Sequence, residues 1–170
     1  LGIRLECEGT RLLFDYGMTA TSPPSYPKES PPVDRMLLTH SHLDHCGMIP
    51  WLTARYDIDI VATPVSCEVG LLLMEDSIKV GKSEGYPEPY NIGDVRTASR
   101  RFREVRFGDT MNIGKLQVKT HPAGHIPGAT MYELRGRTTT LVTGDIHTID
   151  TRLVRRARPA HCDNLIMEST

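Results

Sequence analysis

Several marks of other protein classes are missing from this 170-residue sequence. No apolar run approaches the roughly 18 residues of a membrane-spanning helix, and neither a lipidation motif nor a signal-peptide pattern is present. Acidic and basic residues nearly balance, at 21 against 20, so no overall positive charge indicates nucleic acid, although a local basic groove stays compatible with this balance. With 39% apolar and 24% charged residues, the composition predicts one soluble globular domain without a membrane partner.

Cysteine is scarce, and its four positions form no Cys-x-x-Cys pair: Cys7, Cys46, Cys67 and Cys162. This pattern predicts a reducing intracellular compartment, the cytoplasm or, in a eukaryote, the nucleus. The sequence begins with Leu1 rather than Met and ends on "LIMEST". We therefore expect a piece of a longer chain, truncated at both ends.

Short β-prone runs dominate the pattern, and only two segments favour a regular helix. An amphipathic helix is predicted at 65–81, and a second at 91–102, where Asn91 and Asp94 form an imperfect capping box. The proline-rich segment 19–34 predicts a loop, functional or mobile, and 46–56 a short helix or turn. Strands are expected at 1–7, 11–17, 35–40, 59–64, 104–108, 111–123, 128–136, 138–145 and 164–169. The sum is a layered α/β domain with histidines and acids at strand ends.

The stretch "THSHLDHCG", residues 39–47, follows one of these strands and contains three of the seven histidines. If the strand stops at His40, the following turn lets His40 and His42 face one metal ion while Asp44 and His45 face a second. Imidazole nitrogen suits zinc, and a carboxylate can complete or bridge such a site. Two metals about 3.5–4 Å apart can stabilise the entering and leaving oxygens of a phosphodiester. A single histidine at a strand end is more often structural, but four such positions together favour metal binding.

Further ligand candidates stand at other strand ends. "HPAGHIPGAT" contains His121 and His125, "LVTGDIHT" contains Asp145 and His147, and Asp15 closes "RLLFDYG". Adjacent glycines permit sharp turns and a close approach of the backbone to a metal.

The combined motifs resemble those of the metallo-β-lactamase superfamily. H-x-H-x-D-H is followed about eighty residues later by Gly-His and then by Gly-Asp. "LTHSHLDHCGMIPWL", "AGHIPGA", "TGD" and "IMEST" are similar to the β-CASP nuclease branch, which includes the 73-kDa subunit of cleavage and polyadenylation specificity factor and its archaeal homologues. The resemblance implies the four-layer αββα sandwich, with residues 1–170 forming the N-terminal part of the catalytic domain and the β-CASP cap lying outside them.

The resemblance also implies roles for individual residues. His40, His42 and His125 would bind one zinc, Asp44 and His45 the other, and Asp145 would bridge the two. Asp15 would orient metal-bound histidines, an outer role whose loss is expensive. Glu168 would be the acid that acts with a later histidine on the leaving group. That histidine and a last metal ligand are not in the sequence, so we expect the Asp44/His45 site to be incomplete in this chain and the piece alone to cleave RNA poorly.

The remaining candidates favour structural roles. We expect His121 to be structural or to support a ligand, and His147 to form local hydrogen bonds. His161 and Cys162 resemble a soft-metal pair but lie in a loop that leads into the last strand, while Cys46 and Trp51 are expected in the core.

Arginines gather in two places. Arg96, Arg100 and Arg103 would share one helical face, which is either solvated or a phosphate-binding surface. Arg152, Arg155 and Arg156 follow the aspartate motif and are the candidates for RNA contacts. No aromatic residues are interleaved with these arginines, so base stacking is not indicated.

The function predicted for the parent chain is zinc-dependent cleavage of single-stranded RNA in 3′-end processing or decay, with a metal-bound hydroxide as nucleophile. Two alternatives stay open: a thioester or lactone hydrolase of the same superfamily, and a non-catalytic scaffold in an RNA-processing complex. The intact ligand motifs argue against the scaffold. A homo-oligomer or such a complex is the expected assembly, because truncation would expose an apolar face.

Overall fold

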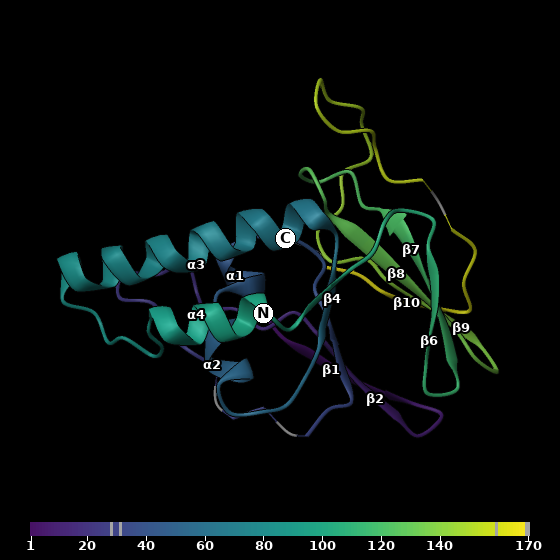
Figure 1. Ribbon diagram of the computed structural model, residues 1–170. Helices are drawn as coiled ribbons and strands as arrows, with labels where there is room; N and C mark the ends of the chain where they lie inside the picture. Colours follow the sequence, from purple (N-terminus) through teal and green to yellow (C-terminus); the bar gives the residue numbers. More distant parts are fainter. Residues whose placement is uncertain (28, 31, 159, 169–170) are drawn as a thin grey trace.

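A computed structural model describes residues 1–27, 29–30, 32–158 and 160–168. Two five-stranded sheets face each other, and the helices lie on the outer side of the first sheet (Figure 1). The described chain therefore has a helix–sheet–sheet arrangement, and none of its helices covers the outer side of the second sheet. These are three of the four layers of the predicted αββα sandwich. Among the described residues, no helix has the length and apolarity needed to cross a membrane.

The first sheet has the strand order β1-β2-β3-β4-β5. β1 and β2 form the predicted antiparallel hairpin, and β2 to β5 run parallel to one another. The strand bounds are Ile3–Cys7, Thr10–Phe14, Arg35–Leu37, Ile60–Ala62 and Phe102–Glu104. The strand predicted at 104–108 is misplaced, because Phe102–Glu104 pairs with β4 and the chain then turns at Gly108, whose φ is +89°.

The second sheet has the order β10-β9-β8-β7-β6 and is antiparallel except for the β9–β10 pair. Its strands are Thr110–Ile113, Leu116–Pro122, Thr130–Arg135, Thr139–Val142 and Asn164–Ile166, from β6 to β10. The predicted strand 111–123 thus divides into two, because Gly114 adopts a φ of +58° in the turn between them. Ser169 and Thr170, the end of the "EST" motif, lie outside the described residues.

The helices follow the predicted order: α1 Leu43–Cys46, α2 Ile49–Thr53, α3 Pro64–Glu84 and α4 Ile92–Ser99. The capping box of α4 is complete, since Asn91 Oδ1 accepts from the backbone N–H of Asp94 and Asp94 Oδ2 accepts from that of Asn91. Because α4 ends at Ser99, Arg103 lies on β5, and the predicted arginine face on one helix is wrong.

Period-two alternation separates the two main cores. Leu12 and Phe14 of β2 face the second sheet, whereas Leu13 faces the helices. Tyr132 of β8 crosses the inter-sheet core and donates its hydroxyl to the carbonyl of Leu38 at 2.8 Å. That bond fixes the end of β3, where the histidine cluster begins.

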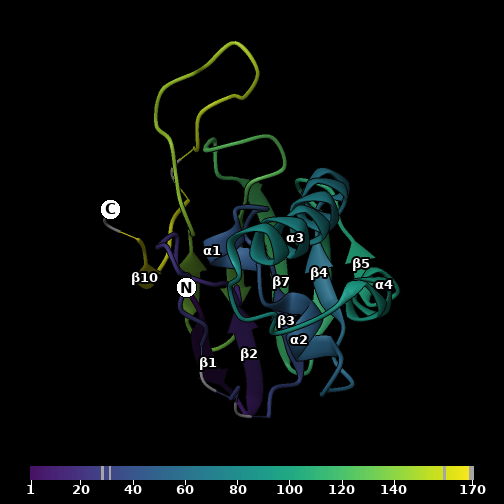
Figure 2. The ribbon, with the colours of Figure 1, turned by 90° about the vertical axis from the view of Figure 1, so that its left-hand side faces the viewer.

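A smaller apolar cluster lies on the outer side of the second sheet, beneath the long segment 146–163. Met131 and Leu141 of the sheet pack there with Ala157 and Cys162 of the segment. The segment projects beyond the strand ends beside the β7–β8 loop in both views (Figure 2). The backbone N–H of His147 donates to the carbonyl of Ala123 at 3.0 Å and fixes this proximity.

Candidate metal centre

The candidate ligands converge because they follow the carboxyl ends of strands that meet at one edge of the two sheets. Asp15 follows β2, and His40 follows β3, which runs parallel to β2. Asp145 follows β9, and Glu168 follows the parallel strand β10. His125 lies in the loop between β7 and β8 at the same edge. Residues up to 153 positions apart are thereby brought into one site (168 − 15).

Two glycines permit the strand-end loops to meet. A Cβ atom at Gly17 would lie 1.9 Å from the backbone carbonyl carbon of Asp44. Gly144 has a φ of +55°, and a Cβ atom there would lie 2.6 Å from Thr39 Cβ. Only glycine fits either position. We expected the backbone at such glycines to approach a metal closely. In the structure, Gly17 and Gly144 instead approach the loops that position the histidines.

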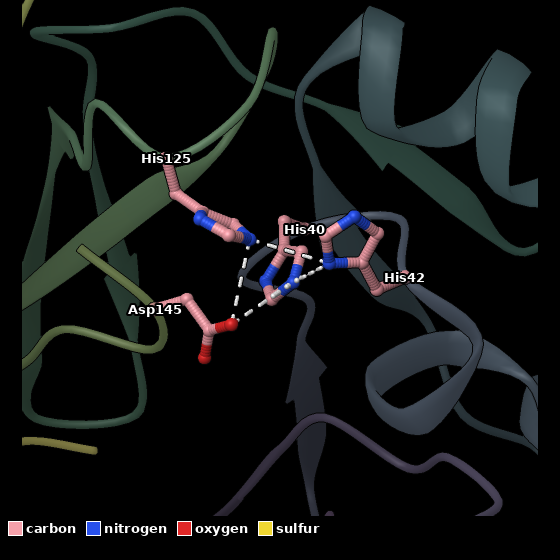
Figure 3. A group of neighbouring side chains, drawn as sticks. All are labelled: His40, His42, His125 and Asp145. Carbon is pink, nitrogen blue, oxygen red and sulfur yellow. Dashed lines mark hydrogen bonds and ion pairs between the residues drawn. The ribbon is translucent and has the colours of Figure 1, made fainter. Parts of the chain in front are cut away.

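The first donor group comprises His40, His42, His125 and Asp145, whose ligand atoms all lie within 4.8 Å of one another (Figure 3). His42 Nδ1 lies 3.0 Å from His40 Nε2 and 3.2 Å from His125 Nε2. Asp145 Oδ2 lies 3.4 Å from His125 Nε2 and 3.8 Å from His40 Nε2. Three imidazole nitrogens and one carboxylate oxygen therefore surround one point, the donor set of a tetrahedral zinc site.

Burial keeps two of these imidazoles neutral. His40 is fully buried, and burial followed by the neighbouring His45 and His42 lowers its pKa to about 2. Burial, again with His42, lowers the pKa of His125. A neutral imidazole retains the lone pair that binds a metal. The lowered pKa values of these two histidines therefore favour metal binding over protonation.

A second donor group adjoins the first and shares Asp145. His45 Nε2 lies 3.4 Å from Asp145 Oδ1, 3.5 Å from Asp44 Oδ2 and 3.7 Å from Glu168 Oε2. His45 Nε2, Asp145 Oδ1 and Glu168 Oε2 are buried, yet none has a hydrogen-bond partner in the described structure. Buried polar atoms normally have partners, so three unsatisfied atoms around one point fit a cation. The donor set therefore fits a second metal ion.

Asp15 lies behind the second group and is almost fully buried. Its Oδ2 lies 2.8 Å from His45 Nδ1, and its Oδ1 accepts from the backbone N–H of Thr39 at 2.7 Å. Burial opposes protonation of His45, but the carboxylates of Asp15, Asp44 and Asp145 together outweigh burial and raise the pKa of His45. With its Nδ1–H bound to Asp15, His45 presents Nε2 to the centre.

Thr39 is a further member of this site that sequence reasoning did not single out. Its hydroxyl donates to Asp15 Oδ2 at 2.8 Å and lies 3.0 Å from His40 Nδ1. One hydroxyl thus connects the supporting carboxylate to a ligand histidine of the first group. Its position directly before His40 at a strand end is the only signal in the sequence.

The other histidines lie apart from the two donor groups. His121 Nε2 lies 2.6 Å from Glu133 Oε2 on the outer side of the second sheet, in a structural ion pair. His147 donates Nδ1–H to the carbonyl of Ile149 at 2.8 Å, a local hydrogen bond as expected. Cys46 is fully buried beneath the cluster and donates to the carbonyl of Ser41. Trp51 packs against Tyr16.

His161 and Cys162 form no metal-binding group with other described residues. Cys162 instead packs into the outer cluster of the second sheet. His161→Ala and Cys162→Ala are therefore expected to leave the metal content of the purified protein unchanged. Elemental analysis of both variants beside the parent measures this, and loss of half the metal would reveal a separate site.

The two arginine groups differ in their partners. Arg103 of the first group forms an ion pair with Asp59, and the nearby Arg101 pairs with Asp57. Arg152, Arg155 and Arg156 are exposed on the segment 146–163, and their guanidinium groups form no ion pair within the described residues. The backbone N–H of Ala157 donates to the carbonyl of His147 at 2.8 Å and closes this segment beside the site.

Two sheets with ligand-bearing loops at one edge define the metallo-β-lactamase fold. The family model of the metallo-beta-lactamase superfamily matches residues 5–163, so the chain belongs to that superfamily. A metallo-β-lactamase of Cronobacter sakazakii with a HARLDQ motif superposes with a TM-score of 0.58 at 19% identity, covering 87% of this chain and 57% of that one. An archaeal superfamily protein, ST1585 of Sulfolobus tokodaii, gives 0.57 at 18% identity, covering 89% and 59%. The predicted fold is confirmed.

Among curated proteins, similar relatives are archaeal. Probable RNase MJ4 of Methanocaldococcus jannaschii is 30% identical over 99% of this chain and 42% of its own length. Transcription termination factor FttA of Pyrococcus horikoshii is 33% identical over 81% of the chain and 22% of its length. RNase aCSPSF2 of Saccharolobus solfataricus is 28% identical over 94% and 34%. The chain thus spans less than half of these relatives, and the resemblance to the β-CASP nuclease branch is confirmed.

Proposed function

We propose that this chain contributes the two-zinc centre of a ribonuclease that cleaves single-stranded RNA, in 3′-end processing or decay. The observation that supports it best is the pair of adjoining donor groups that share Asp145 and leave three buried polar atoms without partners. The names of the archaeal relatives, which include RNases, support RNA as the substrate.

The residues divide between the two ions as follows. His40, His42 and His125 would hold the first zinc with Asp145. Asp44 and His45 would hold the second with the other oxygen of Asp145. When bound, two such ions lower the pKa of water and neutralise charge on the oxygens of a phosphodiester.

Other side chains of the chain would orient these ligands and donate a proton to the leaving group. Asp15 positions His45, and Thr39 connects Asp15 to His40. Glu168 stands beside the second group, where the adjacent Asp145 carboxylate, followed by burial, raises its pKa. A raised pKa favours the protonated form of the carboxyl group, which can donate its proton to the leaving oxygen.

Substrate would be held by charge outside the centre. The guanidinium groups of Arg152, Arg155 and Arg156 lie on the segment that stands beside the β7–β8 loop, which contains His125 (Figure 2). Contacts with phosphates supply much of the affinity of proteins for nucleic acid without selecting a sequence. We infer that these arginines guide the RNA backbone toward the donor groups.

One observation keeps a second candidate open, a thioester or lactone hydrolase of the same superfamily. A largely apolar cavity opens beside His42 and Asp44, and such a cavity could hold an acyl chain. The RNase names of the relatives favour RNA over this alternative. A non-catalytic scaffold is disfavoured because the ligand residues are present and their donor atoms converge in two adjoining groups.

Comparison of substrates tests the proposal. The full-length protein is expected to cleave a single-stranded RNA faster than it hydrolyses a thioester or lactone, by orders of magnitude in kcat/KM. A chelator should abolish the RNA cleavage, and added zinc should restore it, because the metals generate the nucleophile. Robust thioester hydrolysis without RNA cleavage would establish the alternative instead.

A further inference from the structure

A cavity of about 470 Å³ opens directly beside the metal centre. His42 and Asp44 form its inner end, α3 forms one side, and the loops 18–26 and 86–90 form the others. Its volume lies in the range of sites for small organic ligands. Nothing in the roles assigned above uses this space.

Aromatic and proline rings form much of the cavity wall. Tyr26 and Tyr86 are half-buried there, and Tyr90 is almost fully buried behind them. The Tyr26 hydroxyl donates to the carbonyl of Pro87 at 2.8 Å and joins the two loops, while the Tyr90 hydroxyl lies 2.7 Å from Ser77 Oγ on α3. These bonds hold the rings in place. Fixed aromatic faces are the surfaces on which nucleic-acid bases stack.

The charged groups of the wall are acidic. Asp44, Asp76 and Glu88 line the cavity, and no lysine or arginine does so among the described residues. Glu88 is paired with Lys82 at 3.9 Å, and Asp44 is assigned to a metal ion. Asp76 is therefore the carboxylate that would repel a phosphate group here and favour an uncharged occupant. Asp76 has no ion pair or hydrogen bond with other described residues, and it can accept a hydrogen bond from an occupant.

We propose that this cavity binds one base of a single-stranded RNA, next to the phosphate at the metal centre, and that it prefers bases with an exocyclic amino group. The inference rests on the proposed function, since His42 and Asp44 border both the cavity and the centre. Adenine, cytosine and guanine can donate an amino hydrogen to Asp76. Uracil has no amino group, and a carboxylate repels its O4 atom.

Gly81 offers a way to fill the cavity without disturbing the fold. It lies within α3, is buried and lines the cavity, yet a Cβ atom built there meets no atom within 4 Å. The leucine side chain in Gly81→Leu should therefore fill the part of the cavity in which we propose that a base binds. Replacement of a helical glycine with a side chain also favours the helix, so Gly81→Ala is a smaller step in the same direction.

The experiment uses the full-length zinc-loaded protein and ten-nucleotide RNAs that are all uridine or contain one adenosine, cytidine or guanosine. Cleavage beside the single amino-bearing base should exceed cleavage of oligouridine about tenfold, the size of one good hydrogen bond to a charged acceptor. Anisotropy of the same labelled RNAs in the presence of chelator should show the same order of binding.

Three variants test whether the base preference arises in this cavity. Gly81→Leu should reduce cleavage and binding of the amino-bearing RNAs to the oligouridine level, with a melting temperature no lower than that of the parent. Asp76→Asn should narrow or reverse the preference, because an amide can donate to uracil O4. Lys79→Leu, an exposed position of α3 that does not line the cavity, should change neither.

The outcomes separate this inference from the proposed function. Efficient RNA cleavage with no base preference and no effect of Gly81→Leu would overturn the base site while the ribonuclease stands. Absence of both cleavage and binding of RNA would overturn both. If Gly81→Leu instead impaired hydrolysis of a long-chain thioester that the parent accepts, the cavity would hold an acyl chain and the base site would be wrong.

Discussion

Replacing Asp145 with asparagine is expected to weaken zinc binding at both donor groups together, by more than about 100-fold. Loss of an outer group that merely supports a ligand already costs about 10–100-fold. Asp145 contributes more, because Oδ2 lies 3.4 Å from His125 Nε2 and Oδ1 lies 3.4 Å from His45 Nε2. An amide is neutral and has one acceptor oxygen, so it cannot serve two cations at once.

Zinc content after dialysis and competition with a chromogenic chelator measure the loss. Asp57→Asn is the matched control, because that carboxylate is exposed and pairs only with Arg101 among the described residues. RNA cleavage should fall with the metal content in Asp145→Asn and stay at the parent level in the control. An Asp145→Asn protein that retains two tightly bound zinc ions would refute the bridging role.

Much of the candidate site could be predicted from local sequence. His40, His42 and His45 lie within six positions, so their proximity requires only that a strand stop there. Asp145 and His125 could be added because a predicted strand ends shortly before each of them, as another ends at His40. The positions of histidines and aspartates at the ends of predicted strands were therefore enough to predict these metal ligands.

Features that depend on contacts between distant segments could not be predicted. Tyr26, Tyr86 and Tyr90 come from two loops, and only the fold joins them in one cavity, so the sequence did not indicate this aromatic wall. Arg103 was predicted to lie on a helical face, whereas it lies on β5 and pairs with Asp59, and the nearby Arg101 pairs with Asp57. Neither the aromatic wall nor the ion pairs leave a periodic signal in the chain.

The boundaries of helices and strands were the second feature that the sequence predicted poorly. The helix expected to reach residue 102 ends at Ser99, and Phe102–Glu104 becomes an edge strand because Ala62 and its neighbours offer a free partner. Local propensity is weak over such a short run, and pairing with β4 decides its structure. The glycines were identified correctly as close-approach positions, but the partner of Gly17 is the Asp44 backbone.

Asp15→Ala is expected to reduce both stability and zinc affinity. The carboxylate is 1% exposed, and it is bonded to the backbone N–H and hydroxyl of Thr39 and to His45. Breaking a buried charged pair costs about 3–5 kcal/mol of unfolding free energy. Asp15 also has a φ of +60°, a conformation that aspartate and asparagine adopt more readily than alanine. Chemical denaturation of the zinc-free protein measures this cost.

Asp15→Asn separates the supporting role from the orienting role. Asparagine tolerates the same backbone conformation, and its Oδ1 can still accept from Thr39 N–H, so most of the stability should return. Its amide nitrogen, however, would replace the oxygen that faces His45 Nδ1 at 2.8 Å. His45 would then keep Nδ1 as an acceptor and carry its proton on Nε2, the atom that faces Asp145.

A proton on Nε2 removes the lone pair that a metal needs. Zinc affinity of Asp15→Asn is therefore expected to fall about 10–100-fold at the Asp44/His45 group, with little change at the group containing His42. Glu133→Gln is the matched control, because Glu133 is also buried and lies 2.6 Å from His121, remote from the donor groups. It should lower stability without changing zinc affinity. If Asp15→Asn bound two zinc ions as tightly as the parent, the tautomer of His45 would not depend on Asp15, and the carboxylate would serve the fold alone.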